Sequence, residues 1–259
     1  IRDRDTIMNY DAFMEPLTWF FTGMEKHSDS FKQEKIGNPS YFFDSMRHNM
    51  SRMGDSPVRI SMNELSNHDH SRFLTRTNRT VGRTDSRGPK AAEMNVNKGV
   101  FKEAVVVQMT WPGAPTIYYG DEAGVCGWTD PDNRRTYPWG HEDQDLIDFH
   151  KAVIKMHKEN EVFKAGSYKS LYSAYNVIAY GRFTSDDAAI IIVNNNDDEV
   201  RARIPAWEVG LGFDDDVEQL LVTFDGGYST DRLGYHLQSG WLDIGLRKTS
   251  AVVLHKMKW

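Results

Sequence analysis

Residues 58–70 read VRISMNELSNHDH, a short apolar run that passes directly into a polar cluster. Turn residues at 55–57 precede the run, so the pattern predicts a buried strand over residues 58–62. Asn67, His68 and Asp69 follow this strand. We expect their side chains to lie at its carboxyl end and to face a cleft.

A second stretch repeats this arrangement. Residues 111–124 read WPGAPTIYYGDEAG and predict a buried strand over residues 116–119. Asp121 and Glu122 come next, but neighbouring residues in extended chain point to opposite faces, so we expect them to stabilise the fold rather than to work as a pair. The two stretches together favour parallel strands.

Helical patterns separate the expected strands. We predict a strand at residues 7–10, helices at 15–25, 39–52, 98–110 and 144–158, and an exposed loop at 81–90, which is rich in glycine, serine and arginine. A long loop covers residues 123–139. Repeated strand–helix units of this kind are typical of an α/β domain with a parallel sheet.

The apolar period changes to two after residue 161. Residues 177–180, 188–193, 200–204, 217–224 and 251–255 resemble antiparallel strands, and turn residues separate them. We therefore predict two domains, an α/β domain at residues 1–161 and an all-β domain at residues 162–259.

Composition excludes several classes of function. The 259 residues carry a formal net charge of −6, so the basic surface that nucleic-acid binding requires is missing. No apolar run approaches the ~20 residues of a membrane span, so we expect no membrane partner. Cys126 is the single cysteine, and no Cys/His spacing predicts a zinc site. The first residues, IRDRD, contain neither a starting methionine nor a signal peptide, so we expect a longer parent protein and leave its localisation open.

Several motifs resemble those of the α-amylase family of glycoside hydrolases. Asn67-His68-Asp69 resembles the family's Asn-His-Asp motif, and residues 111–124 resemble its eighth-strand signature. The sequence DPDNRR at residues 130–135 is similar to neopullulanase and cyclomaltodextrinase-like members, and Met8-Asn9-Tyr10 is similar to their sixth strand.

This resemblance implies a specific fold. Members have a (β/α)8 TIM barrel, and this chain would hold its C-terminal portion, strands six to eight, followed by an antiparallel β-sandwich. The family's nucleophilic aspartate and acid/base glutamate would precede Ile1. We therefore expect the chain alone to be inactive, and we expect self-association through the exposed edge of the half barrel. The resemblance implies calcium in the parent protein, but no cofactor and no metal ligand in this chain.

The resemblance also assigns roles to residues. Asp69 would be the third carboxylate, which stabilises the transition state, and His68 would bind a sugar hydroxyl. Asn67 would bind sugar or hold its turn by local hydrogen bonds. Asp130 and Arg134 would bind sugar in outer subsites or form a surface ion pair.

Aromatic and cationic side chains also occur around this site. Trp128, on the long loop, is the aromatic residue that we expect to stack on a sugar ring, whereas we expect Tyr10, Trp111 and Trp139 to lie in the core. Arg72 and Arg76 would order the carboxylates or face solvent.

Two classes of function follow. The first is retaining hydrolysis of α-1,4 or α-1,6 glucosidic bonds in starch-like glucans, pullulan or cyclodextrins by the parent enzyme, with transglycosylation as a variant that uses the same residues. The second is a non-catalytic module that binds glucan or serves as a partner subunit. The partner in both cases is an α-glucan.

Overall fold

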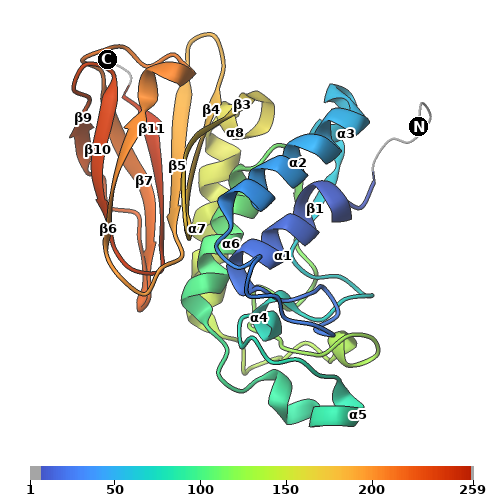
Figure 1. Ribbon diagram of the computed structural model, residues 1–259. Helices are drawn as coiled ribbons and strands as arrows, with labels where there is room; N and C mark the ends of the chain where they lie inside the picture. The colour runs from blue at the N-terminus through green and yellow to red at the C-terminus, as the bar shows by residue number, and fades with distance from the viewer. Residues whose placement is uncertain (1–6, 258–259) are drawn as a thin grey trace.

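The computed structural model describes residues 7–257. Helices and loops form one part of the molecule, and antiparallel strands form a layer beside it (Figure 1). The N-terminal half of the chain lies in the helical part, and the C-terminal third forms the strands.

Eight α-helices occur among the described residues. They are α1 (Glu15–Thr22), α2 (Pro39–Met53), α3 (Asp55–Ile60), α4 (Phe73–Arg76), α5 (Thr84–Arg87), α6 (Lys98–Thr110), α7 (Gln144–Glu159) and α8 (Glu161–Ala165). A π-helical turn spans Tyr10–Met14, and 3-10 turns span Pro89–Ala92, Asp132–Arg134 and Ala206–Val209.

Eleven strands accompany these helices in the described part of the chain. They are β1 (Met62–Glu64), β2 (Ala114–Thr116), β3 (Ser167–Ala174), β4 (Val177–Phe183), β5 (Ala188–Asn194), β6 (Val200–Pro205), β7 (Asp216–Phe224), β8 (Gly227–Ser229), β9 (Gly234–His236), β10 (Trp241–Leu246) and β11 (Ser250–Lys256).

The parallel strands are short. β1 pairs with β2 in parallel, with Met62 opposite Ala114, and Met8 forms a parallel bridge to Met62 on the other side. The carboxyl ends of all three segments therefore lie at the same edge, as the sequence predicts for Asn67, His68 and Asp69.

The predicted bounds of both strands were wrong. Residues 58–60 belong to α3, because Pro57 is tolerated in the first turn of a helix, and the strand begins only at Met62. β2 ends at Thr116 because its partner β1 ends at Glu64, so Ile117 and Tyr118 have no ladder to join. Residues 7–10 provide one bridge and then a π-helical turn instead of a strand.

Local capping explains why the longer helices match their predicted ranges. The Asn97 side chain accepts a hydrogen bond from the Val100 amide at 3.0 Å at the start of α6, and the Asp143 side chain accepts one from the Leu146 amide at 3.2 Å at the start of α7. The predicted loop at residues 81–90 is partly helical instead, since it contains the short helix α5.

Two antiparallel sheets form the strand layer. The larger has the order β3-β4-β5-β11-β7-β8, with β9 also on β7, and the smaller pairs β10 with β6. Alternate residues of the central strands face a shared cluster with the smaller sheet, for example Ile190 and Ile192 with Ile204 and Leu242. The opposite face packs against the helices.

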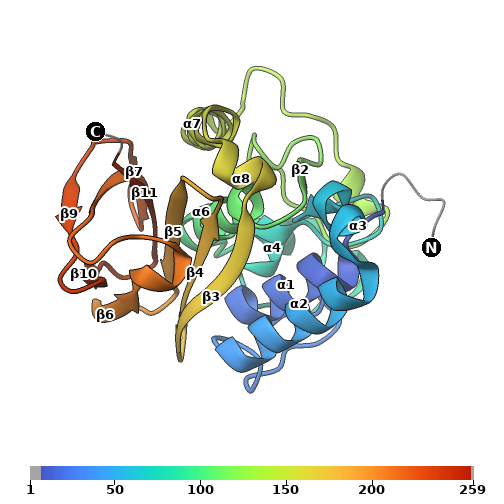
Figure 2. The ribbon, with the colours of Figure 1, turned by 90° about the horizontal axis from the view of Figure 1, so that it is seen from above.

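The helical layer and the larger sheet share one hydrophobic core. Phe101 and Val105 of α6 belong to the same buried cluster as Tyr180 and Ile191 of the sheet. Figure 2 shows α6 and α8 beside β3, β4 and β5. Within the described residues, no helix is both long and apolar enough to cross a membrane.

Candidate active site

Asp69 lies at the carboxyl edge of the parallel strands. Its side chain is 49% exposed, and the Tyr10 hydroxyl donates a hydrogen bond of 3.4 Å to its Oδ2 atom. The His68 Nε2 atom lies 3.3 Å from Asp69 Oδ1, and the His68 side chain is 52% exposed. The structure therefore brings Tyr10, His68 and Asp69 together on an accessible surface.

Asn67 holds the turn that presents Asp69. Its Oδ1 atom accepts hydrogen bonds from the Asp69 amide at 2.9 Å and the His70 amide at 3.1 Å. Its Nδ2 atom donates to Glu64 at 3.2 Å, and the residue is 2% exposed. Of the two roles considered for Asn67, the turn role has direct contacts, and sugar binding stays a prediction.

Two residues of the long loop fix Asp69 from the other side. Thr129 Oγ1 donates to the Asp69 carbonyl at 2.6 Å, and the buried Asn133 side chain donates to the carbonyls of Asn67 and His70 at 3.1 and 2.8 Å. Sequence analysis missed both residues. Asn133 lies between Asp130 and Arg134 in the DPDNRR motif, and its place in this motif was the sequence feature that could have indicated its role.

A buried ion pair lies behind this edge. Arg72 Nη1 lies 3.0 Å from Asp121 Oδ1, with side-chain exposures of 0% and 6%. Arg72 also donates to the carbonyls of Tyr119 and Asn133 at 2.7 and 2.9 Å. Of the two alternatives considered for Arg72, solvent exposure is wrong. Arg76 is also fully buried and donates to the Leu65 carbonyl, so it does not face solvent either.

Asp130 and Arg134 form a half-exposed ion pair. Their side chains are 51% and 50% exposed, and Arg134 Nε lies 2.8 Å from Asp130 Oδ1. The surface ion pair, one of the two alternatives that the sequence left open, is therefore present. Half of each side chain remains accessible, so the pair can still contact a sugar. Sugar binding by this pair stays a prediction.

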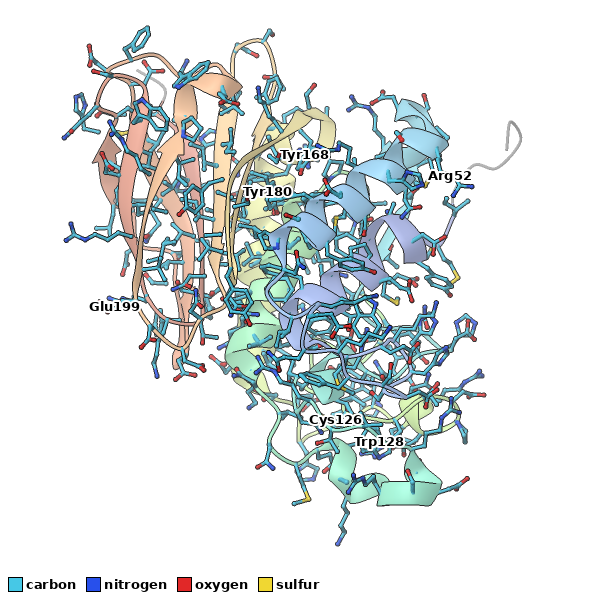
Figure 3. All side chains as sticks on the ribbon, in the orientation of Figure 1. Arg52, Cys126, Trp128, Tyr168, Tyr180 and Glu199 are labelled. Carbon is cyan, nitrogen blue, oxygen red and sulfur yellow. The ribbon has the colours of Figure 1, made fainter. Side chains whose placement is uncertain are left out.

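The prediction that Trp128 stacks on a sugar ring was wrong. Trp128 is fully buried and donates its indole N–H to the Gly88 carbonyl at 3.0 Å, so neither ring face is available to a sugar. Figure 3 labels Trp128 and Cys126 among the loops in the lower part of the helical region. Trp139 is instead 79% exposed, with its ring centroid 4.5 Å from that of Tyr137, so the expectation of a core position for Trp139 was also wrong.

Burial controls the protonation of groups next to Asp69. Burial, followed by the charges of Asp69 and Glu64, raises the pKa of Tyr10 to about 12, so its hydroxyl remains a donor at neutral pH. Burial lowers the pKa of His70 to about 3, with Arg76 adding to the effect. His70 is therefore neutral, and it packs edge-on against the Tyr10 and His27 rings.

The other carboxyl groups at this edge are engaged. Glu64 is 5% exposed and accepts the Asn67 hydrogen bond, and burial raises its pKa. Burial also raises the pKa of Asp121, although the Arg72 charge opposes it. Between residues 7 and 257, no group of three or more His, Cys, Asp or Glu side chains is arranged to hold a metal ion. Asp69 is thus the accessible carboxylate beside the turn at 67–70.

Comparison with known proteins identifies the family. The profile described as "Alpha amylase, catalytic domain" matches residues 4–223. The chain belongs to the α-amylase family. The match runs through the parallel strands and the site around Asp69 and ends within β7.

Related α-amylase family proteins include two bacterial enzymes. The chain is 44% identical over 122 residues, 47% of its length, to an amylopullulanase of Thermoanaerobacter thermohydrosulfuricus. It is 35% identical over 180 residues, 69% of its length, to a cyclomaltodextrinase of Thermoanaerobacter pseudethanolicus. The similarity to cyclomaltodextrinases that the DPDNRR motif predicts is confirmed.

A solved α-amylase shares the fold. The enzyme of Geobacillus thermoleovorans, whose crystal structure contains acarbose, matches 98% of this chain with a TM-score of 0.73 and 20% identity. The chain covers 48% of that structure, and 8% and 26% of the amylopullulanase and the cyclomaltodextrinase. This α-amylase family chain therefore spans less than half the length of each of these relatives.

Proposed function

We propose that this chain contributes one carboxylate, Asp69, to the active site of a retaining glycoside hydrolase. The substrates would be starch-like glucans, pullulan or cyclodextrins, and the bond cleaved an α-glucosidic bond. The observation that carries the proposal is the accessible Asp69 side chain at the carboxyl ends of parallel strands, with Tyr10 and His68 beside it. Enzymes built on β/α barrels place their catalytic groups at this edge.

The finer architecture belongs to the same proposal. The parallel segments at Met8, β1 and β2 would be strands six, seven and eight of a (β/α)8 barrel. Residues 1–161 would form the C-terminal part of this catalytic barrel, and residues 162–259 would form the C-terminal sandwich domain. Support comes from the parallel register and from the shared hydrophobic cluster of the two antiparallel sheets.

Retaining hydrolysis needs two further carboxyl groups. One protonates the leaving oxygen and the other attacks the sugar carbon, and the two are about 5–5.5 Å apart. Glu64 and Asp121 are buried and already bonded to Asn67 and Arg72. We therefore assign the nucleophilic aspartate and the acid/base glutamate to sequence outside these 259 residues.

Asp69 would act on the positively charged sugar ring of the transition state. A carboxylate held at a fixed position stabilises developing positive charge without reorganising during the reaction. Tyr10 and Thr129 restrict the Asp69 side chain and backbone, respectively. His68 would bind a hydroxyl of the same sugar, and Asp130 with Arg134 would contact sugars further along the chain.

The decisive experiment is the Asp69→Asn variant of the full-length protein, assayed on maltooligosaccharides. We expect kcat to fall by about 10²–10³-fold with a much smaller change in KM, because the lost interaction forms mainly in the transition state. The Asp214→Asn variant, which changes a carboxylate of the strand layer, serves as the control. Equal losses in kcat and in substrate affinity would contradict the proposed role.

A glucan-binding module without catalysis is the second candidate. The 79% exposed Trp139 ring favours it, because an open indole face binds sugar without any catalytic group. Affinity electrophoresis in soluble starch separates the two functions. Retarded migration of a full-length protein that releases no reducing sugar would support the binding module and exclude the hydrolase.

Self-association through the parallel strands is a separate proposal. The three residues of β2 are each partly exposed, whereas interior strands of a closed barrel are covered on both edges. Size-exclusion chromatography of the 259-residue chain should then show a dimer or larger species. A monomer with cooperative unfolding would exclude this arrangement.

A further inference from the structure

A cavity lies at the amino ends of the parallel strands, opposite the Asp69 site. Its volume is about 240 Å³, and Val58 and Gly113, which precede β1 and β2, line it together with Tyr168. Figure 3 shows Tyr168 between the sheet and the helices, far from the loop that carries Trp128. Three cationic side chains, Arg59, Lys164 and Arg182, line the same cavity.

Arg182 is buried without a counter-charge. It is 1% exposed, and its Nη1 and Nη2 atoms donate to the carbonyls of Thr110 and Gly166 at 2.6 and 2.8 Å. Its Nε atom has no partner within residues 7–257, and no carboxylate there influences its charge. A buried cation without an anion is costly, since backbone carbonyls replace only part of its hydration.

Arg59 places a second guanidinium group beside the first. Its Nη1 atom donates to the Ala165 carbonyl at 2.7 Å, and Ala165 directly precedes the Gly166 that binds Arg182. Burial lowers the pKa of Arg182 to about 10; Tyr180 opposes this shift, and the Arg59 charge adds to it. Two positively charged guanidinium groups therefore bind the carbonyls of the consecutive residues Ala165 and Gly166.

Carboxylates neutralise only part of this charge. Asp55 Oδ2 lies 2.8 Å from Arg59 Nε, but its side chain is 78% exposed. Lys164 lies 2.7 Å from Glu161, and its own side chain is 41% exposed. Asp55 is the one carboxylate among the described residues that line the cavity, against three cations.

We propose that this cavity binds a phosphate group. Guanidinium forks match tetrahedral oxyanions, and an anion here would contact the partly exposed Arg59 and Lys164 side chains and supply the negative charge that buried Arg182 lacks. The cavity also exceeds the space of a single small ion, since a water molecule occupies about 30 Å³. The group comes from free phosphate or from a sugar phosphate.

A purely structural role for Arg182 explains less of the site. Arg182 does close the carboxyl ends of α6 and α8 through Thr110 and Gly166. That role leaves the missing counter-charge of Arg182, the neighbouring Arg59 and the cavity itself unexplained. The phosphate site lies at the amino ends of the strands and shares no residue with the Asp69 site, so it is independent of the proposed hydrolase activity.

Isothermal titration calorimetry of the full-length protein with inorganic phosphate tests the site. We expect saturable binding, and Arg59→Gln should weaken it about tenfold through the loss of one charge-assisted contact. Arg203→Gln removes an exposed, ion-paired arginine of β6, away from this cavity, and should leave the affinity unchanged. Absence of saturable binding, or equal weakening by both variants, would overturn the proposal.

Two further measurements complete the test. Sodium phosphate should raise the Tm of the wild-type protein relative to sodium chloride of equal ionic strength, and the rise should be smaller in both Lys164→Gln and Arg59→Gln. An unchanged Tm difference in both variants would exclude the site. Titration with glucose 1-phosphate identifies the source: tighter binding than inorganic phosphate indicates a sugar phosphate, and weaker binding indicates the free ion.

Discussion

Arg72 and Asp121 join the two polar segments that follow β1 and β2 through a buried contact of 3.0 Å. The pair lies behind Asp69, because Arg72 follows the turn at 67–70 and Asp121 follows β2. The Arg72 guanidinium also lies 4.1 Å from the centre of the Tyr118 ring. One cation therefore ties both strand ends and their loops together.

Removing the charge of Asp121 should destabilise the fold strongly. Asp121→Asn leaves the Arg72 charge buried without its anion, so we expect the free energy of unfolding to fall by about 3 kcal/mol. Urea denaturation followed by circular dichroism measures this loss. The matched variant Asp130→Asn disrupts a half-exposed pair and should cost less than about 1 kcal/mol. Similar losses in the two variants would refute the importance of burial.

Tyr10 should support activity without supporting the fold. Tyr10→Phe removes the hydroxyl that donates to Asp69, so we expect kcat of the full-length protein to fall about tenfold. The pKa of about 12 keeps this hydroxyl protonated, so the ratio of wild-type to variant kcat should stay constant between pH 6 and pH 8. Tyr41→Phe, which removes a hydroxyl bonded to Lys35, is the control and should leave kcat unchanged.

Glu103 should make stability depend on pH. It lies in the middle of α6, its two carboxyl oxygens are buried without a partner among the described residues, and burial raises its pKa well above the ordinary 4.5. The folded state therefore binds a proton more tightly than the unfolded state. This contribution to stability is fully present below pH 4.5 and is lost as the pH rises towards the folded pKa.

The Glu103→Gln variant tests this dependence. The amide cannot ionise, so the variant should gain stability relative to wild type as the pH rises from 5 to 8. Urea denaturation at several pH values measures the difference, and Glu159→Gln on α7, which changes an exposed carboxyl, should show no such trend. A constant difference between Glu103→Gln and wild type across this range would disprove the raised pKa.

Trp128 and Trp139 should respond in opposite ways to truncation. Trp128→Ala opens a cavity in the core and should cost about 3–5 kcal/mol of unfolding free energy. Trp139→Ala changes an exposed ring and should alter stability by less than about 0.5 kcal/mol, while weakening retention in starch gels if the ring contacts glucan. Equal stability losses would contradict the burial difference.

Short-range patterns account for the features that the sequence predicts well. The start of α6 at Lys98 follows from Asn97, and the start of α7 at Gln144 follows from Asp143, because each cap acts within three residues. The Asn-His-Asp motif likewise places Asp69 directly after a strand. These features need no information from distant parts of the chain.

Strand limits and burial required the tertiary structure. β2 ends at Thr116 because its partner β1 ends at Glu64. The residues around Thr116 carry no information about the length of β1. Trp128 on the long loop looks accessible from its neighbours, yet the Gly88 carbonyl, 40 residues away, binds its indole. Exposure depends on which segments pack over a residue, so local composition does not determine it.

The family, the main helices and the residues at the carboxyl ends of the strands could all be predicted from sequence motifs and periodicity. The burial of Arg72 against Asp121, and the binding of Arg59 and Arg182 to the adjacent carbonyls of Ala165 and Gly166, became visible only in the folded chain. The difference lies in the range of the interactions. Caps and periodicity act within a few residues, whereas buried Arg72 contacts Asp121, 49 residues away, and Arg59 reaches Ala165, 106 residues away.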